Sequence, residues 1–166
     1  NGKTLSFDKG RGYMEKDWGH SFPEGYIWMQ SNHFSKKETS IKISIAKIPW
    51  LRSSFIGFIA GLMIEGRLIQ FTTYNRTILE NCSVNQKEVR IVMENKKYKL
   101  SIVAQREKGT SLAAPISGFM NGRIEESMNA EIHVVLFNKK NNNKILDDTG
   151  LSAGIEVAGK YELLLK

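Results

Sequence analysis

The sequence predicts an all-β fold, an antiparallel sandwich or barrel of roughly ten strands. Apolar residues alternate with polar ones along most of the chain, whereas no long stretch has the period of an amphipathic helix. Glycine, proline and asparagine separate these alternating runs at the spacing that hairpins require. The 166 residues leave room for one domain with a sizeable core.

Three strands are predicted near the start of the chain. Residues 12–18 alternate and form the first strand, and Pro23 marks residues 20–25 as a turn or loop. Residues 26–34 form the second strand. The third, residues 40–48, has the cleanest alternation, with isoleucines on one side and lysine and serine on the other.

Three hairpins, an irregular segment and a closing strand are predicted after this point. Residues 109–127 are expected to form an irregular loop or a short helix, because Pro115, Gly118 and Gly122 interrupt the alternation. Residues 155–165 form the closing strand. The hairpins pair residues 55–65 with 67–74, 84–94 with 97–107, and 131–138 with 144–148.

Residues 55–64 are apolar on both faces of their predicted strand. A strand with one face in water should carry polar residues on that face. The second apolar face therefore needs a neighbour, which could be another domain, a dimer partner or a hydrophobic ligand inside a closed barrel. The run has ten residues, which is too short to cross a bilayer as a helix, so no transmembrane segment is expected.

The composition argues against several classes of partner and reaction. The formal net charge is +7, but the lysines are scattered as on solvated strand faces, so no nucleic-acid partner is expected. The three histidines and the single cysteine, Cys82, lack metal-ligand spacing, so no metal site is expected. The absence of a phosphate loop and of a nucleophile elbow argues against the usual hydrolases, kinases and dehydrogenases.

The compartment and the extent of the chain are inferred from three features. A single cysteine allows no internal disulfide, which fits a reducing, cytoplasmic compartment. The chain begins at Asn1 without a methionine or a leader, so we expect a fragment of a longer protein. The abundance of lysine, asparagine and isoleucine indicates an AT-rich bacterial genome.

The first predicted strand carries the candidate acids. Alternation places Tyr13, Glu15 and Asp17 on one face and Trp18 on the other. Two carboxylates on one face can raise each other's pKa, and burial adds to this effect, so that one of them could serve as a general acid. The alternative is a solvated face on which both carboxylates are ionised.

The second predicted strand has a face typical of a binding pocket. Tyr26, Trp28, Gln30 and Asn32 share this face. Aromatic rings with a few orienting polar groups are typical of small-molecule sites. The alternative is the edge of a core, in which Gln30 and Asn32 form hydrogen bonds to the backbone.

Residues 12–34, GYMEKDWGHSFPEGYIWMQSNHF, resemble the signature of the tocopherol cyclase family. In that signature a Gly-Tyr-x-Glu-Lys-x-Trp-Gly strand is followed by Ser-Phe-Pro and a Trp-x-Gln-x-Asn-x-Phe strand. Residues 114–127 and 154–159 are similar to the family's late loop and its closing Gly-x-Glu-x-x-Gly strand. The matching positions of the signature are Gly12, Tyr13, Glu15, Lys16, Trp18, Gly19, Ser21, Phe22, Pro23, Trp28, Gln30, Asn32 and Phe34.

The resemblance implies a lipocalin-like β-barrel of the calycin group, related to carotenoid hydratases of the hydroxyneurosporene synthase type. Family members usually have two such domains, and residues 1–166 would be the single C-terminal one. The implied reaction needs no cofactor: an acid protonates the prenyl alkene of a prenylquinol, and the phenol oxygen closes a chromanol ring. By this resemblance Glu15 or Asp17 is the acid, and the ligand-binding residues are Tyr13, Trp18, Tyr26, Trp28, Gln30 and Asn32.

We therefore expect a lipocalin-like domain that binds a prenylquinol or another isoprenoid lipid, either as a cyclase or as a non-catalytic lipid-binding module. A further alternative is a structural domain that packs on an N-terminal half or on a homodimer mate. Because a ligand of this kind is hydrophobic, we also expect access to a membrane surface. The protein is expected to be cytoplasmic or membrane-associated.

Overall fold

The computed structural model describes residues 2–18, 20–116 and 118–166. In this part of the chain the regular structure consists of ten strands and two short 3-10 helices, η1 (Thr73–Asn75) and η2 (Tyr161–Leu164). The predicted all-β class is therefore confirmed. The strands are β1 (Gly25–Ser31), β2 (Ser40–Trp50), β3 (Ser53–Ile64), β4 (Arg67–Thr72), β5 (Ile78–Val84), β6 (Glu88–Glu94), β7 (Tyr98–Gln105), β8 (Thr110–Ile116), β9 (Phe119–Asn138) and β10 (Asn143–Gly159).

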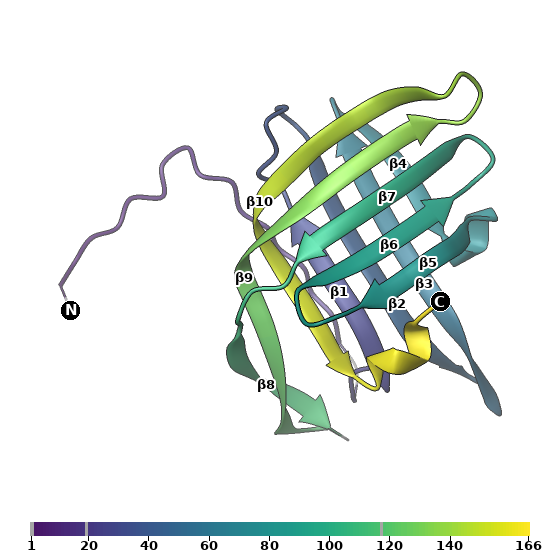
Figure 1. Ribbon diagram of the computed structural model, residues 1–166. Coiled ribbons are helices and arrows are strands. Elements are labelled where there is room, and N and C mark those ends of the chain that lie inside the picture. The colour runs from purple at the N-terminus through teal and green to yellow at the C-terminus, as the bar shows by residue number, and fades with distance from the viewer. Residues whose placement is uncertain (1, 19, 117) are drawn as a thin grey trace.

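The strands form one antiparallel sheet in the order β4-β3-β2-β1-β10-β9-β7-β6-β5, to which β8 adds by pairing with β9. Figure 1 shows this sheet rolled on itself, with β1 to β3 facing β5 to β7 across the interior. The strands β4 and β5 are the two ends of the order, so the barrel-like sheet is not closed. The three predicted hairpins are present as β3–β4, β6–β7 and the tip of β9–β10.

Apolar side chains fill the interior of the rolled sheet. Alternation directs Ile27 and Met29 of β1 and Ile43 and Ile45 of β2 inward, and all four are fully buried. The interior that could have been a ligand cavity is thus occupied by the protein's own side chains. The largest fully buried ones are Phe71, Ile27, Met29, Ile43, Ile45, Leu62, Ile91, Met93, Leu100, Ile102, Ile132 and Leu136.

Residues 12–18 do not form the predicted first strand and have no ladder partner. The reason lies in the neighbouring strand β1, which pairs with β10 on one side and with β2 on the other. No free edge is left beside β1 for another strand to join. The alternating residues 12–18 instead lie on the outer surface of the sheet, where side-chain contacts hold them.

The segment from residue 109 to residue 127 is a hairpin rather than the predicted loop or short helix. β8 pairs with the first part of β9, and Gly118, with a φ of 86°, lies in the turn between them. The register shifts around Pro115, but the strand continues through it. A proline is tolerated there because β8 is an edge strand, whose outer side needs no ladder bond.

The end of the chain packs against the sheet. The closing strand predicted for residues 155–165 divides into the end of β10 and η2, and Leu164 of η2 is buried in the core. The Lys166 N–H donates to the Cys82 carbonyl at 2.8 Å, and the Cys82 N–H donates to the Lys166 carbonyl at 3.2 Å. The last residue is therefore paired with strand β5.

The strand with two apolar faces is β3. Its inner face carries Phe58, Ala60 and Leu62, which are buried in the core. On the outer face Ile59 is 50% exposed, and Leu68 of the neighbouring strand β4 is 51% exposed. Within the described residues this outer apolar face is partly open to solvent.

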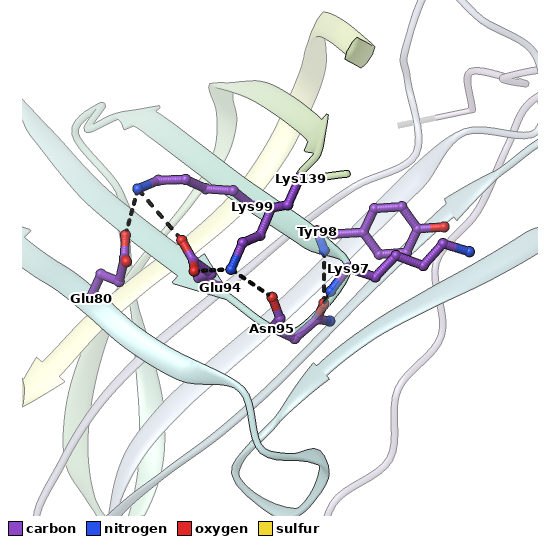
Figure 2. Close-up of polar contacts among 7 residues, drawn as sticks. All are labelled: Glu80, Glu94, Asn95, Lys97, Tyr98, Lys99 and Lys139. Atoms are coloured by element: carbon purple, nitrogen blue, oxygen red, sulfur yellow. Dashed lines mark hydrogen bonds and ion pairs between the residues drawn. The ribbon is translucent and has the colours of Figure 1, made fainter. Parts of the chain in front are cut away.

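The outer face of β5, β6 and β7 is charged. The Lys99 ammonium of β7 lies 2.7 Å from the Glu80 carboxylate of β5 and 3.8 Å from the Glu94 carboxylate of β6. Figure 2 shows that Lys139 also binds Glu94 and the carbonyl oxygen of Asn95. We call Glu80, Glu94, Lys99 and Lys139 the ionic face.

Candidate functional site

The outer face of β1 combines aromatic and polar side chains. Alternation turns Tyr26, Trp28 and Gln30 outward, while Ile27 and Met29 point into the core. Tyr26 and Gln30 are nevertheless 6% and 5% exposed, so this outward face is covered. A covered outer face that carries polar groups is a candidate site.

The register of β1 with its two neighbours determines which residues flank this face. Trp28 lies opposite Glu156 of β10, and Gln30 lies opposite Gly154 of β10 and Lys42 of β2. A Cβ at Gly154 would be 3.0 Å from the Trp28 ring, so glycine leaves the space that the indole occupies. The site therefore includes side chains from three strands that are distant in sequence.

The N-terminal segment, which we define as residues 10–18, supplies part of the cover. The Asn32 side-chain amide donates to the Gly12 carbonyl at 2.9 Å. The Tyr13 ring packs edge-on against Trp28, with the ring centroids 5.9 Å apart. These contacts hold the segment against the face through side chains, without a backbone ladder.

Glu15 of the N-terminal segment is held by three donors. Its carboxylate accepts hydrogen bonds from the Tyr13 hydroxyl and, at 2.9 Å, from the Trp28 indole N–H. The Lys42 ammonium lies 3.0 Å away. Partial burial raises the pKa of Glu15, but these three partners outweigh burial and bring the pKa below its ordinary value. Glu15 is therefore held in its ionised form.

Glu156 has the opposite environment. The Tyr26 hydroxyl donates to its carboxyl group at 2.7 Å, and Glu126 of β9 lies directly opposite it across the ladder. Burial raises the pKa of Glu156, the Tyr26 hydrogen bond only partly opposes this, and the negative charges of Glu126, Glu15 and Asp17 raise it further. Burial also raises the pKa of Glu126. The protonated form of Glu156 is thus favoured relative to an ordinary glutamate.

Two carboxyl groups in contrasting states therefore lie beside Trp28. Glu15 accepts a hydrogen bond from the indole N–H and has a lowered pKa, whereas burial raises the pKa of Glu156. Environments that move two pKa values apart separate the roles of acid and base within one site. This arrangement can donate a proton from one side and accept one on the other, next to an aromatic ring.

Five of the predicted site residues come together here: Tyr13, Glu15, Tyr26, Trp28 and Gln30 share direct contacts or the same face. The contacts of Glu15, however, produce a lowered pKa instead of the raised one that repulsion from a neighbouring carboxylate would give.

The other predicted residues have different positions. Asn32 donates to the backbone of the N-terminal segment, as in the core-edge interpretation. Trp18 is 86% exposed and lies beside the Lys16 ammonium. Asp17 is exposed, and its charge acts on the site from a distance.

Three residues of the site were missed by sequence reasoning: Lys42, Glu126 and Glu156. Lys42 was assigned to the polar side of its strand, which is correct, but its partner across the sheet depends on the register. Glu156 stands in the closing Gly-x-Glu-x-x-Gly stretch, which resembled the family's last strand and was the one available signal. Glu126 stands in residues 114–127, which are similar to the family's late loop, but no further signal distinguishes it from a solvated strand residue.

Two further observations bear on the class of protein. Within residues 2–18, 20–116 and 118–166, no group of three or more His, Cys, Asp or Glu side chains is arranged to hold a metal ion. None of the helices described is long and apolar enough to cross a membrane.

The fold and this face define a barrel-like domain that carries an aromatic and carboxyl-bearing site on its outer surface. The chain belongs to the tocopherol cyclase-like family, whose model matches residues 1–159. The resemblance of residues 12–34 is therefore confirmed.

Two plant proteins are among its relatives. A probable chloroplastic tocopherol cyclase of Oryza sativa subsp. japonica is 26% identical over 171 residues, which cover 96% of this chain and 36% of the relative. A chloroplastic tocopherol cyclase of Zea mays is 27% identical over 171 residues, which cover 96% of this chain and 35% of the relative. The chain spans about a third of the length of these curated relatives. No solved structure matches it.

Proposed function

We propose that this domain binds a prenylquinol, or a similar isoprenoid lipid, against the outer face of β1 and promotes acid-catalysed closure of a chromanol ring. The observation that carries the proposal is the pair Glu15 and Glu156, whose environments move their pKa values in opposite directions beside Trp28. Family membership supports the same reaction class. We assign the domain to the cytoplasm, with access to the membrane surface from which such a substrate would come.

In the proposed reaction the Glu156 carboxyl group transfers its proton to the less substituted carbon of the prenyl alkene. The alkene π electrons form the new C–H bond and leave a tertiary cation, which the faces of Trp28 and Tyr26 stabilise. A lone pair of the quinol oxygen then forms the C–O bond, and Glu15 accepts the phenolic proton. The product is an isomer of the substrate, and return of the proton to Glu156 through solvent restores the site without a cofactor.

The substrate head group would bind where Tyr13 now contacts Trp28. Tyr13 is 43% exposed and held through its contacts with Glu15 and Trp28, so we expect the N-terminal segment to shift when the ligand binds. The Gln30 amide would then hold a quinol oxygen. We assign Asn32 a role in holding the segment, and Asp17 and Trp18 a place along the path of the prenyl chain.

The test is incubation of the protein with prenylquinols and detection of the chromanol by mass spectrometry. Glu156→Gln should lower chromanol formation by about 100-fold or more, because the proton donor is lost. Glu131→Gln, an exposed position on the same strand as Glu126, is the matched control and should leave it unchanged. Binding is measured separately by tryptophan fluorescence. If the wild type binds prenylquinols without converting them, the domain is a non-catalytic lipid-binding module. If it neither binds nor converts them, the proposal is refuted.

A second candidate is an interaction domain, and the half-exposed outer face of β3 and β4 favours it. In this role Ile59 and Leu68 would pack on an N-terminal domain or on a second copy of the chain. Light scattering over a range of concentrations tests the second copy, because a dimer formed through this face should be lost in Ile59→Lys. A concentration-independent monomer would exclude the second copy as the occupant of this face.

A further inference from the structure

Large apolar side chains stand in solvent at two hairpin tips. At the β2–β3 tip Trp50 is 64% exposed and Leu51 is 94% exposed. At the β8–β9 tip Phe119 is 68% exposed and Met120 is 59% exposed. Scattered single residues of this kind are ordinary on a protein surface, but paired residues at two tips form a pattern.

Leu51 also has an unusual backbone conformation. Its φ of 51° lies in the left-handed region, which glycine, asparagine and aspartate adopt most easily. A leucine at this position costs backbone energy and gains no packing within the domain, because its side chain is almost fully exposed. The two-residue turn between β2 and β3 requires a positive φ at this position, so the turn explains the conformation but not the choice of an exposed leucine for it.

Both tips project from the same end of the rolled sheet. Tyr26, at the start of β1, pairs with Ala46, and β2 continues beyond this point to Trp50. Glu156, near the end of β10, pairs with Glu126, and β9 extends beyond this point back to its start at Phe119. Figure 1 shows the two hairpins at the lower end of the molecule.

The charges next to the tips are positive. Residues 47–55 and 116–123 contain Lys47, Arg52 and Arg123 but no aspartate or glutamate. Lys47 shares the Glu24 carboxylate with Lys160, at 2.7 and 2.8 Å. Arg52 and Arg123 form no ion pair within the described residues.

We propose that this end of the domain docks on an anionic lipid bilayer, with the β2–β3 and β8–β9 tips inserted among the head groups. Tryptophan and other large apolar side chains partition into the membrane interface, and adjacent cations are attracted to anionic lipids. The tips are separate convex points, and a fluid lipid surface accommodates such points without a complementary shape. A rigid protein partner would instead need matching hollows for each of them.

The test is sedimentation of the protein with sucrose-loaded vesicles of phosphatidylcholine, with and without phosphatidylglycerol. The wild type should bind the anionic vesicles more tightly. Replacing both residues of one tip, as Trp50→Ser with Leu51→Ser or as Phe119→Ser with Met120→Ser, should weaken binding about tenfold or more. Ile78→Ser is the matched control, because Ile78 is 60% exposed but lies at the opposite end of the sheet, where β5 pairs with the end of β6.

A second pair of variants tests how much positive charge contributes to vesicle binding. Arg52→Gln should weaken binding to anionic vesicles about fivefold, whereas Arg67→Gln, at the far end, should have no effect. Brominated phosphatidylcholine should quench tryptophan emission of the wild type, and this quenching should decrease in Trp50→Phe. Circular dichroism confirms that each variant is folded.

No substrate is present in these measurements, so their outcome is independent of the proposed reaction. The docking surface is refuted if the wild type does not sediment with either kind of vesicle, or if the tip variants bind as well as the wild type. It is also refuted if the tips instead mediate a concentration-dependent dimer that the tip variants abolish.

Discussion

Two regions of the outer surface use glutamates in opposite ways. On the ionic face the carboxylates are paired with lysine ammonium groups, and the Lys139 hydrogen bond is the largest effect that lowers the pKa of Glu94. On the face of β1 Glu156 is partly buried, and its hydrogen-bond donor is the hydroxyl of Tyr26. Burial there raises the pKa.

The difference shows that strand position alone does not decide the state of a surface glutamate. Both residues point outward from central strands of the same sheet. What differs is the set of partners: the Glu94 carboxylate lies beside two lysine ammonium groups, whereas Glu156 has a phenol as its donor and a second carboxyl group opposite it. A covered region of outer surface can therefore have the electrostatic properties of a buried site.

The largest expected effect comes from removing the indole that the covered face is built around. Trp28→Ala should lower the free energy of unfolding by about 2 kcal/mol, because the change removes a large half-buried ring and the donor of one Glu15 hydrogen bond. Urea denaturation measures the change. The control is Tyr74→Ala, because Tyr74 is 80% exposed on η1, and its loss should be within about 0.5 kcal/mol. Equal losses in the two variants would contradict the description of the β1 face as covered.

The second prediction concerns the sign of the pH dependence. The pKa of Glu156 is raised in the folded state, so the wild type loses stability as the pH rises through and above the ordinary value of 4.5. Glu156→Gln lacks this loss and should gain stability relative to the wild type between acidic and neutral pH. The glutamine can still accept the Tyr26 hydrogen bond.

Glu94→Gln should change the pH dependence of stability in the opposite direction from Glu156→Gln. The lowered pKa of Glu94 contributes stability above 4.5 that disappears as the pH falls through the folded value. The variant should therefore be less stable than the wild type at neutral pH and equal to it in acid. Thermal unfolding from acidic to neutral pH measures both slopes, and slopes of the same sign would overturn the contrast.

The smallest expected effect compares one lysine from each region. Lys42→Met leaves the Glu15 carboxylate, whose side chain is 23% exposed, without its cation and should cost about 1 kcal/mol. Lys99→Met on the ionic face should cost less than about 0.5 kcal/mol, because Glu94 keeps Lys139 as a partner and the Glu80 side chain is 36% exposed. NMR titration should also show a rise in the pKa of Glu15 in Lys42→Met. A Lys99 variant that is the less stable of the two would reverse the ranking.

The sequence predicted the sheet well where local signals were sufficient. The alternation of residues 40–48 and the glycine at residue 66 specify a strand and a hairpin turn without reference to the rest of the chain. The segment from residue 12 to residue 18 alternates as clearly, yet it is not a strand, because β2 and β10 already occupy both sides of β1. Which strands pair with β1 is a tertiary property that periodicity does not contain.

The candidate site, like the sheet, could be predicted only in part from the sequence. The outward face of β1 and its aromatic residues followed from the period of two. Glu156, however, is 130 residues from Tyr26 in sequence and reaches it only through the pairing of β10 with β1. The states of the two carboxyl groups could not be predicted because they depend on partners, such as Lys42, that the register supplies.

Besides β8, the incompletely closed sheet has an edge strand at each end of its order, β4 and β5, and such edges are the sites from which β-sheets grow into aggregates. The backbone of Lys166 occupies both hydrogen-bonding groups of Cys82 on the β5 edge, and buried Leu164 fixes the chain end in place. At the opposite edge β4 has only six residues and begins with Arg67, and a short strand with a charge at its start is a poor template. The edges of β4 and β5 are thus less open to intermolecular strand addition, by different means.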